Sequence, residues 1–485
     1  MATGAVQQRI QASEPSAVRM RIGSEWRNGS DWDEVRDPYR GGVVAIAPRA
    51  TPADLHAAIA AAAAAKPAAA AMPGYERAAL LRRAAELLRE RGDEIAEVMT
   101  RETGKALKDS RAEAVRTLDT LQLSAEEAVR IEGEHVPLDA TPMGAGKIAM
   151  LLRFPVGVVA GITPFNAPLN LASHKIAPAI AAGNTVVLKP PPQAPLTVHK
   201  LVEVFVDAGT PPGMLNVVYG HDAGPALVRD PRVDFISFTG STRVGAEIRA
   251  ASGLRRVALE LGGAGPTIVH HDAPLEEAAT LCARNAMRLA GQSCISVQNI
   301  YVHASVAPAF IDSVLRAVAA LKVGDPLDLD TDVGTLVDEH AARRVESWIG
   351  EAVAAGATLL RGGSRRGAQI DPAVLTGVNA DMKVVCEEVF GPTVTVQTYE
   401  DVETVFETVS RSRFGLHCGV FTASLPLAIR AVRALRTGGV ILNGTSTWRT
   451  DQLPYGGVKD SGIGREGPRY SMRDMTQERL VVFNL

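Results

Sequence analysis

The sequence predicts an α/β protein built around parallel sheets, and three observations support this prediction. Short, almost continuously apolar runs recur at 156–162, 185–188, 215–218, 234–238 and 257–261. Helical segments separate most of these runs, as expected for strands buried on both faces of a parallel sheet. A second series of apolar runs follows at 298–303, 393–398, 418–422 and 439–442. Since 485 residues are too many for one hydrophobic core, we expect two or three domains.

The elements before the first series are predicted from local patterns. Residues 1–18 are polar and aperiodic, so we expect a loose tail there. Short strand-like runs with Gly and Asn turns follow at 21–22 and 43–46. Helices are expected at 53–65, 76–101 and 106–130.

Helical spacing is clearest in the third of these helices. Small and apolar residues there recur every three or four positions, at Leu118, Leu121, Ala125 and Ala128. At the other end of the chain, the run 480–483 predicts a final strand. The strands at 156–261, with their helical crossovers, are typical of a Rossmann-like arrangement.

Composition and charge exclude several classes of protein. A net charge of -3 provides no basic field for nucleic acid and no polybasic patch for a membrane. The alanine-rich stretch near Ala57 is interrupted by Lys66, Pro67 and Pro73, so no membrane helix is predicted. The N-terminus has no continuous apolar core and is not read as a signal peptide. We therefore expect a cytoplasmic protein without nucleic-acid or membrane partners.

Cysteine and glycine patterns give two further expectations. The four cysteines are widely spaced and form no CxxC pair, which favours free thiols in a reducing compartment over disulfides. No metal site is predicted. The segment 143–147 superficially suggests a phosphate loop, but it lacks the Walker spacing and the Ser/Thr after the lysine, so a turn is expected.

The stretch from 260 to 294 carries the most informative chemistry. It opens with Glu260 on a diglycine bend, Glu260-Leu261-Gly262-Gly263, and closes with Cys294 on the loop Gly291-Gln292-Ser293-Cys294. A thiol can form a covalent intermediate, and a nearby carboxylate can activate the water that releases it. The alternatives are a buried structural cysteine and a paired or solvated glutamate at a strand end. The other cysteines, Cys282, Cys386 and Cys418, lie on apolar patterns and are expected to be structural.

Several blocks, in order, resemble the aldehyde dehydrogenase superfamily over residues 20–485. They are Thr163-Pro164-Phe165-Asn166, Leu188-Lys189-Pro190, Phe238-Thr239-Gly240-Ser241-Thr242, the two motifs above, Glu387-Glu388-Val389-Phe390-Gly391-Pro392 and Pro454-Tyr455-Gly456-Gly457-Val458-Lys459. Any one block could arise by chance, whereas the ordered set is specific.

The resemblance implies a three-part α/β architecture. A Rossmann-like NAD(P)-binding domain would comprise 19–130 and 151–260, and an α/β catalytic domain would comprise 261–466. A small β element for oligomerisation would combine 131–150 with 467–485. The expected assembly is a homodimer or a homotetramer.

The resemblance also implies catalytic roles. Cys294 would attack the aldehyde, and the Asn166 side chain, with the backbone N–H of Cys294, would stabilise the developing oxyanion. Glu260 would serve as general base for thioester hydrolysis, and Lys175 would lie near the proton-exit route. The alternatives are a turn or N-cap asparagine for Asn166 and a surface lysine for Lys175.

The cofactor residues follow from the same resemblance. The loop beginning Gly240-Ser241, after a strand and before a helix, would bind the pyrophosphate. Lys189 would hold the adenosine ribose, Glu388 the nicotinamide ribose, and Phe390 would pack beside the nicotinamide ring. The remaining predicted contacts are Thr163, Pro164, Phe165, Gly220, Val244 and Leu261.

One departure from the family pattern concerns cofactor choice. NAD-preferring members typically carry a glutamate three residues after the ribose lysine, and here that position is Pro192. Its loss removes an acceptor for the 2′-hydroxyl and a repulsion against a 2′-phosphate. NAD(P) is therefore expected, with NADP favoured over NAD.

The substrate pocket is predicted to suit a small polar or anionic aldehyde. His174 occupies a position where many members carry an aromatic residue, and Arg288 and Arg449 could bind an anion. Asn170, Ser293 and Trp448 are also expected near the tunnel. Anion-binding members place an arginine at the position of Ser293, and arginines on a solvated face are the alternative for Arg288 and Arg449.

The predicted reaction is NAD(P)-dependent oxidation of such an aldehyde to its carboxylic acid through a thioester. The first alternative is transfer of the acyl group to coenzyme A, but members of that kind usually lack the glutamate found here as Glu260. The second is a catalytically silent structural homologue, although Cys294, Asn166 and Glu260 are all present.

Overall fold

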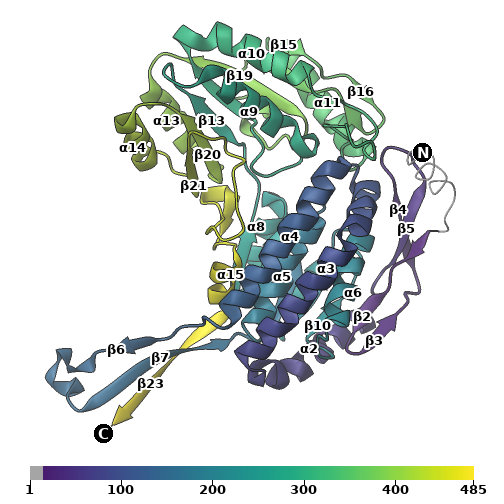
Figure 1. The fold of residues 1–485 in the computed structure, drawn as a ribbon, viewed down its shortest axis with the longest axis vertical. Helices are drawn as coiled ribbons and strands as arrows, with labels where there is room; N and C mark the ends of the chain where they lie inside the picture. The colour runs from purple at the N-terminus through teal and green to yellow at the C-terminus, as the bar shows by residue number, and fades with distance from the viewer. Residues whose placement is uncertain (1–14, 485) are drawn as a thin grey trace.

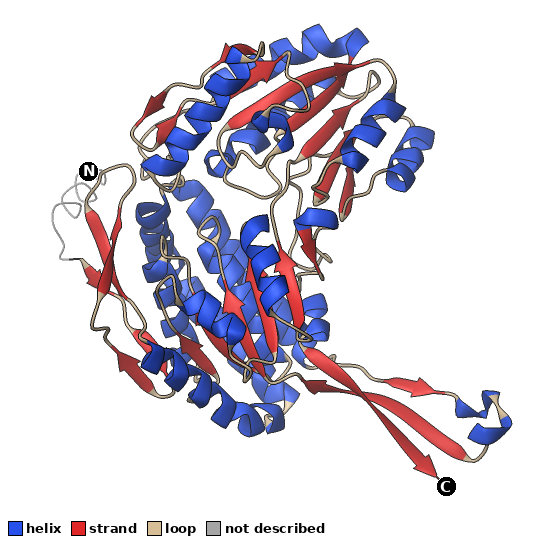
Figure 2. Ribbon diagram, turned by 180° about the vertical axis from the view of Figure 1, so that it is seen from behind, coloured by secondary structure: helices blue, strands red, loops and turns tan. Residues whose placement is uncertain are grey.

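The computed structural model describes residues 15–484 as two α/β bodies and a projecting β arm (Figure 1). The lower body contains the first strand series, the upper body contains the second, and the arm carries the C-terminus away from both (Figures 1 and 2). The chain crosses from the lower to the upper body after Glu260, the last residue of β12. The first predicted catalytic motif therefore lies at the junction of the two bodies.

The sheet of the lower body contains the five strands expected from the first series. They are β8 (Val158–Ile162), β9 (Thr185–Lys189), β10 (Leu215–Val217), β11 (Phe235–Thr239) and β12 (Arg256–Glu260). All five pair in parallel, in the order β12-β11-β8-β9-β10. Antiparallel edge strands complete the sheet: β2 (Met20–Ile22), β3 (Glu25–Arg27) and β22 (Gly462–Ile463). Residues 462–463 thus belong to this sheet, although we assigned them to the catalytic domain.

Helices cover both faces of this sheet. They are α2 (Pro52–Ala71), α3 (Gly74–Thr103), α4 (Leu107–Ala128), α5 (Pro168–Ala181), α6 (Pro195–Asp207), α7 (Ala223–Arg229) and α8 (Thr242–Ala251). The three predicted N-terminal helices are therefore confirmed. The first begins with a capping box, in which Thr51 and Asp54 each accept a hydrogen bond from the other's backbone N–H. The second ends at Gly104 in a left-handed conformation.

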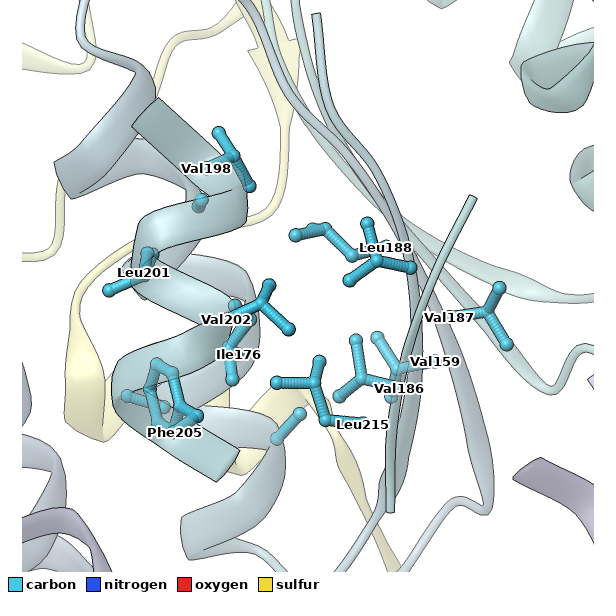
Figure 3. Packing of buried hydrophobic residues seen from close by; sticks show 14 of the residues in the cluster. Val159, Ile176, Val186, Val187, Leu188, Val198, Leu201, Val202, Phe205 and Leu215 are labelled. Atoms are coloured by element: carbon cyan, nitrogen blue, oxygen red, sulfur yellow. The ribbon is translucent and has the colours of Figure 1, made fainter. Parts of the chain in front are cut away.

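Apolar side chains fill the space between the helices and the sheet. In Figure 3, Val202 of α6 and Ile176 of α5 face Val186 and Leu188 of β9, while Val187 points to the opposite face. These residues are at most 2% exposed. Each such side chain contributes about 1.5–3 kcal/mol when it leaves water. This packing holds the carboxyl ends of the strands in fixed positions.

The upper body contains a seven-stranded sheet in the order β15-β18-β19-β14-β13-β20-β21. Its strands are β13 (Pro266–Val269), β14 (Asn299–His303), β15 (Thr358–Arg361), β18 (Ala373–Thr376), β19 (Thr393–Tyr399), β20 (His417–Phe421) and β21 (Gly439–Leu442). A short hairpin, β16 (Arg365–Arg366) and β17 (Gln369–Ile370), lies beside it. The four strands predicted from the second series are present, and β13, β15 and β18 were not predicted.

The helices of the upper body are α9 (Leu275–Met287), α10 (Ala307–Ala319), α11 (Glu339–Ala354), α12 (Lys383–Cys386), α13 (Val402–Arg411) and α14 (Leu425–Ala434). Cys282 and Cys418 are completely buried in this body, as expected for structural cysteines. Cys386 is only half-buried, so the expectation of a buried position is wrong for this residue.

The arm consists of β6 (Glu134–Val136), β7 (Lys147–Pro155) and β23 (Thr476–Asn484). The predicted final strand pairs antiparallel with β7 over its whole length. The segment 143–147 forms the end of a short 3₁₀ helix, a turn and the start of β7, which agrees with the prediction of a turn. Between the lower body and β23, α15 (Pro468–Asp474) packs on α5 and α4, so residues 468–474 lie with the lower body rather than in the arm.

The N-terminal segment is more ordered than the sequence suggested. Residues 1–14 of the expected tail lie outside the described part of the chain. Within the remainder, β1 (Ser16–Ala17) pairs in parallel with β5 (Val43–Pro48), which also pairs with β4 (Trp32–Arg36). The predicted boundary of the tail at residue 18 is therefore wrong, because residues 16–17 form a strand. Composition does not reveal this pairing.

No single helix among residues 15–484 is long and apolar enough to cross a membrane. Only α2 and α3 taken together pass that test of length and composition, and they meet at an angle of 115°.

Candidate active site

The predicted cofactor and catalytic residues gather at the carboxyl edge of the lower sheet. Thr163 follows β8, Lys189 ends β9, Ser241 follows β11 and Glu260 ends β12. β8 lies between β9 and β11, so the strand order reverses direction at β8. Open α/β sheets bind their ligands at such a switch point, outside the carboxyl ends of the strands.

The two sequence motifs lie against each other at this edge. After Glu260 the chain bends through Gly262 and Gly263. A β-carbon added to Gly263 would lie 2.4 Å from the Cys294 carbonyl oxygen, and one added to Gly262 would lie 2.6 Å from Glu388 Oε2. Only residues without a β-carbon permit this approach. The diglycine bend thus brings the carboxylate loop, the thiol loop and Glu388 together.

The backbone before Cys294 is strained. Leu289, Ala290 and Gly291 are consecutive left-handed residues, with φ of 55°, 51° and 70°. Left-handed Leu and Ala are uncommon and cost roughly 1–3 kcal/mol each, and such residues cluster at functional loops. Close packing maintains the turn, since a β-carbon on Gly291 would lie 2.0 Å from the Gly391 carbonyl oxygen.

The Cys294 side chain is half-buried and close to a phenol. Its Sγ lies 2.9 Å from Tyr455 Oη, within hydrogen-bond distance. Burial raises the pKa of the thiol to about 11, while the hydrogen bond with Tyr455 acts in the opposite direction. Ionisation of the thiol therefore depends on the donors around Sγ.

Asn166 lies beside the nucleophile loop, on the segment between β8 and α5. Its Nδ2 donates to the Gln292 carbonyl oxygen at 3.1 Å, and its Oδ1 is buried without a hydrogen-bond partner among the described residues. The helix after it begins with Pro168 as its first residue, and Ala167, not Asn166, is the N-cap. The N-cap alternative for Asn166 is therefore wrong.

Within the described chain, Glu260 is a buried carboxyl group without a polar partner of its own. It is 4% exposed, and neither of its side-chain oxygens has a hydrogen-bond partner among the described residues. Burial and the charge of Glu466 raise its pKa well above the ordinary value. It is not the paired or solvated glutamate of the alternative interpretation. A carboxyl group with a raised pKa is a stronger base when ionised, as a general base requires.

Lys175 is a buried residue of α5, and the surface-lysine alternative is wrong. It is 1% exposed, and its Nζ donates to Glu466 Oε2 and to Thr239 Oγ1, each at 2.7 Å. Burial opposes ionisation of Glu466, but Lys175 and Arg449 outweigh it and hold the pKa of this carboxyl group below its usual range.

Arg449 links Glu466 to the aromatic ring beside Cys294. Its Nη2 donates to Glu466 Oε1 at 2.7 Å, and its guanidinium carbon lies 3.7 Å from the centroid of the Tyr455 ring. The side chain is 7% exposed. The solvated-face alternative is therefore wrong for Arg449.

A second carboxylate extends this buried network. Asp451 accepts from both Nε and Nη2 of Arg116, at 2.8 and 2.7 Å, and lies 2.8 Å from His174 Nε2. Burial opposes ionisation of Asp451, but His174 and Arg116 outweigh it and hold its pKa below the usual range. Burial lowers the pKa of His174, so its ring is neutral at neutral pH.

Two of the six predicted substrate residues lie at the nucleophile, and the other four do not. His174 and Asn170 are at most 1% exposed, and both bond to Asp451, so they do not line an open tunnel as expected. Arg288 pairs with Asp109 at 3.0 Å on the wall of a cavity of about 640 Å³, and Trp448 is 54% exposed. Only Ser293, half-buried beside Cys294, and Arg449 lie at the nucleophile.

The sequence alone did not indicate four residues of this network: Arg116, Asp451, Tyr455 and Glu466. Tyr455 lies in one of the family motifs, residues 454–459, so its place in that motif could have indicated it. Glu466 and Asp451 carried no local signal, because their partners on α4 and α5 are hundreds of positions away along the chain.

The loop that we predicted to bind the cofactor pyrophosphate has the features of an anion site. Ser241 is the N-cap of α8 and accepts from the Val244 N–H, and the Gly240 N–H donates to the Glu260 carbonyl oxygen at 3.0 Å. A β-carbon on Gly245, in the first turns of α8, would clash with Leu261, so glycine lets this helix pack closely on the strand end. Helix N-termini of this kind favour phosphate groups.

Lys189 and Thr163 lie on neighbouring strands at this edge. The Thr163 N–H donates to the Lys189 carbonyl oxygen at 3.2 Å, and Thr163 Oγ1 is buried without a partner among the described residues. Burial lowers the pKa of Lys189 to about 8. Gly220, with φ of 102°, closes the turn after β10. These groups leave polar atoms available to a ligand.

The predicted nicotinamide end surrounds Glu388. This half-buried residue accepts from the Gly263 N–H at 3.2 Å, and desolvation of its carboxyl group raises the pKa to about 7. Phe390, which has a φ of 50°, meets Phe165 edge-to-face at a centroid distance of 5.8 Å. Pro164 and Phe165 are half-buried. A flat ring could pack against these aromatic side chains beside Cys294.

Comparison with known proteins agrees with this arrangement. A profile of the aldehyde dehydrogenase family matches residues 26–481. The chain is 45% identical to 3-sulfolactaldehyde dehydrogenase of Priestia aryabhattai, over 96% of this chain and 97% of that protein. The crystal structure of aldehyde dehydrogenase 21 from Physcomitrella patens, in complex with its reaction product succinate, superposes with a TM-score of 0.95, at 39% identity over 98% of this chain and 99% of that one.

A third relative concerns the cofactor. The NADP-dependent glyceraldehyde-3-phosphate dehydrogenase of Bacillus halodurans, solved in complex with NADP, superposes with a TM-score of 0.94, at 35% identity over 98% of this chain and 100% of that one. Nearly the whole chain is matched in each of these comparisons, and the two solved structures share its fold. The chain therefore belongs to the aldehyde dehydrogenase family, whose members are oxidoreductases acting on aldehydes.

Proposed function

We propose that the protein oxidises a small anionic aldehyde to its carboxylic acid with NAD(P). The observation that carries this proposal is the buried cation Arg449, stacked on Tyr455 beside the Cys294 thiol. Cations buried this close to a nucleophile favour a substrate that brings its own negative charge.

The charges of the buried network support the anionic class. Three cations, Arg116, Lys175 and Arg449, are matched by only two carboxylates that stay ionised, Asp451 and Glu466. Burial lowers the pKa of His174, and burial with the charge of Glu466 raises the pKa of Glu260, so both groups favour their uncharged forms. An anionic substrate would therefore complement these cations. The sulfonate of 3-sulfolactaldehyde and the second carboxylate of succinate are groups of this kind.

The first chemical step uses the nucleophile loop. The Cys294 thiolate attacks the aldehyde carbon, and the carbonyl oxygen gains the charge of the broken π bond. The Cys294 N–H and the Asn166 Nδ2 are the proposed donors to this oxygen, and Asn166 would exchange the Gln292 carbonyl for it. A nicotinamide held beside Phe390 and Phe165 would supply the hydride acceptor, and loss of the hydride from the hemithioacetal would leave a thioester on Cys294.

The second step uses the buried carboxyl groups. Glu260 in its ionised form would remove a proton from water, and the resulting hydroxide would attack the thioester and release the acid. Lys175 would stabilise the negative charge of Glu260, and its ion pair with Glu466 would pass the proton outward. The products are the carboxylic acid and the free Cys294 thiol.

The residues at the sheet edge fit NAD(P). The N-terminus of α8 would hold the pyrophosphate, Glu388 would accept from the nicotinamide ribose, and Phe390 and Phe165 would flank the ring. We propose that NADP is preferred. Lys189 is buried without an ion-pair partner in residues 15–484, and Pro192 supplies no carboxylate to repel a 2′-phosphate.

The assembly and location are also proposals. The arm exposes the apolar side chains Ile148, Leu152, Leu480, Val482 and Phe483. We propose that a second copy covers them in a homodimer or homotetramer, which light scattering of the purified protein would distinguish from a monomer. The four cysteines are all free, which supports the reducing cytoplasm as its location.

The experiment that tests the proposed function measures reduced-cofactor formation at low concentrations of NAD and NADP. 3-Sulfolactaldehyde and succinic semialdehyde would be compared with neutral lactaldehyde and butanal. The proposal expects kcat/KM to be at least about tenfold higher for the anionic pair, a difference of about 1.4 kcal/mol, with Cys294→Ala inactive. Equal or better turnover of butanal would contradict the anionic class.

Two controls in the same assay separate the alternative reactions. Added coenzyme A would accelerate turnover and yield an acyl thioester if the enzyme were acylating. Hydrolysis to free acid, unaffected by coenzyme A, is expected instead because Glu260 is present and buried. Binding of NADP without turnover of any aldehyde would favour the silent structural alternative.

A further inference from the structure

The hydroxyl group of Tyr455 lies within hydrogen-bond distance of the sulfur of Cys294, the predicted nucleophile. Its Oη lies 2.9 Å from Cys294 Sγ, and no other side-chain hydrogen bond to Sγ occurs within residues 15–484. The Asn166 amide is bonded to the Gln292 carbonyl oxygen instead of to the sulfur. The phenol is therefore the polar group that meets the sulfur before substrate arrives.

Backbone hydrogen bonds to Glu466, and the ion pairs of Glu466, hold Tyr455 in position. Tyr455 and Glu466 form an antiparallel bridge, with N–H to O distances of 2.9 and 2.6 Å in the two directions. Glu466 is itself held by Lys175 and Arg449, each at 2.7 Å. Tyr455 is thus anchored, through Glu466, to Lys175 of α5 and to Arg449, and has little freedom to leave Cys294.

The ring of Tyr455 is held on its sides as well. The Arg449 guanidinium carbon lies 3.7 Å from the ring centroid, and the His417 ring meets it edge-on at 5.0 Å. Ile295 and Leu416 complete an apolar cluster around it, and Tyr455 is 2% exposed. A cation over the face of a phenol withdraws electron density and makes its O–H a stronger donor.

We propose that Tyr455 is a catalytic residue that donates its O–H to the Cys294 thiolate and so stabilises the ionised nucleophile. Arg449 is a positioning residue that acts through the ring. This inference rests on the proposed function, because it assigns a role within the cysteine chemistry, and it concerns a step before any aldehyde binds.

The proton balance of this step is simple. The thiol S–H bond breaks, its proton leaves to water, and the electron pair stays on Sγ. Tyr455 keeps its own proton throughout, since burial raises its pKa well above the ordinary value. An O–H that stays intact can only donate to the anion. It therefore favours the thiolate over the thiol, because hydrogen bonds to charged groups are the stronger ones.

The test is alkylation of the whole protein by iodoacetamide between pH 8 and 12, a range that includes the midpoint of a thiol with a pKa of about 11, with modified peptides quantified by mass spectrometry. Tyr455→Phe removes the hydroxyl and keeps the ring. It is expected to raise the pH midpoint of Cys294 alkylation by about one unit and to slow alkylation about tenfold below that midpoint. The half-buried Cys386 is an internal reference whose alkylation should not change.

Two further variants guard against misinterpretation. Tyr399→Phe removes another buried phenol of the same body, hydrogen-bonded to His270 at 3.1 Å, and should leave the Cys294 midpoint unchanged. Replacement of Tyr455 by 3-fluorotyrosine keeps the hydroxyl, strengthens the donor and should lower the midpoint. This variant covers the case in which Tyr455→Phe fails to fold.

The possible outcomes are distinct. A midpoint that moves up in Tyr455→Phe and down with fluorotyrosine supports the proposal. An unchanged midpoint in either folded variant overturns it and leaves Tyr455 as a packing residue. Because alkylation requires neither aldehyde nor cofactor, this result stands even if no aldehyde is turned over, so failure of the proposed function is recognised separately.

Discussion

Gly456→Ala would test whether the position of Glu260 controls release of the acid. Gly456 has no left-handed φ, so alanine can adopt its backbone conformation, and only space is at issue. The added β-carbon would lie 2.8 Å from Glu260 Oε1 and 2.8 Å from the Gly464 carbonyl oxygen. The oxygen of Gly464 belongs to the backbone next to β22, whereas the Glu260 side chain has no hydrogen bond to hold it. We therefore expect the carboxyl group to move.

The size of the effect follows from the geometry. An ordinary carbon–oxygen contact requires the carboxyl group to move by about half an ångström. A displacement of about 1 Å can cost about 10²-fold in rate, so about tenfold slower hydrolysis is expected, or about 1.4 kcal/mol. Attack by Cys294 should be preserved, because its loop does not touch the new methyl group.

Rapid-mixing kinetics would separate the two steps. Gly456→Ala should produce a burst of reduced cofactor of wild-type rate and amplitude, followed by a slower steady state. Gly350→Ala is the matched control, because an added β-carbon there meets nothing within 4 Å. If Gly456→Ala lowered the burst rate and left the steady state intact, the assignment of Glu260 to hydrolysis would be refuted.

Three further predictions follow from the charges of the site. Burial is the largest cause of the raised pKa of Glu260, and the negative charge of Glu466 is the second. Glu466→Gln removes that charge, so the acid limb of the pH profile of acyl-enzyme hydrolysis should move to lower pH. Hydrolysis of p-nitrophenyl acetate would measure this limb, and an unchanged limb would contradict the prediction. Asp451→Asn should cost about 3 kcal/mol of stability at neutral pH. The pKa of Asp451 is depressed in the folded protein, so its carboxylate stabilises the fold above the pKa of an unfolded aspartate, near pH 4, and this stabilisation is lost at lower pH. The thermal midpoints of the variant and the wild type should therefore converge in acid. A constant difference between them would argue against the prediction. Pro192→Glu should lower kcat/KM with NADP at least about tenfold relative to NAD, through repulsion of the 2′-phosphate, and an unchanged ratio would remove Pro192 from cofactor selection.

Much of the fold could be read from local patterns. Buried strands such as Val158–Ile162 appear as apolar runs because both of their faces are covered. The helix Pro52–Ala71 starts where a capping box and a proline predict a start. Strands such as Thr358–Arg361 escaped detection because a four-residue edge strand with three exposed residues shows no buried apolar run.

The boundaries between the parts were less predictable. β22 (Gly462–Ile463) joins the lower sheet by pairing with β12, although we assigned residues 261–466 to the catalytic domain. A two-residue strand has no periodicity of its own, so only its partner defines it. For the same reason, α15 could not be assigned to the lower body without the helices on which it packs.

The sequence by itself determined the chemistry that is carried by local motifs: the thiol of Cys294, the carboxylate of Glu260, the amide of Asn166 and the glycines that let their loops approach each other. The tertiary structure alone decided the electrostatic setting of these groups. It placed Glu466 between Lys175 and Arg449, stacked Arg449 on Tyr455 and withdrew His174 from the predicted tunnel into the network of Asp451. The physical reason is that a motif specifies neighbours along the chain, whereas pKa values and pocket charge depend on burial and on partners brought near only by folding.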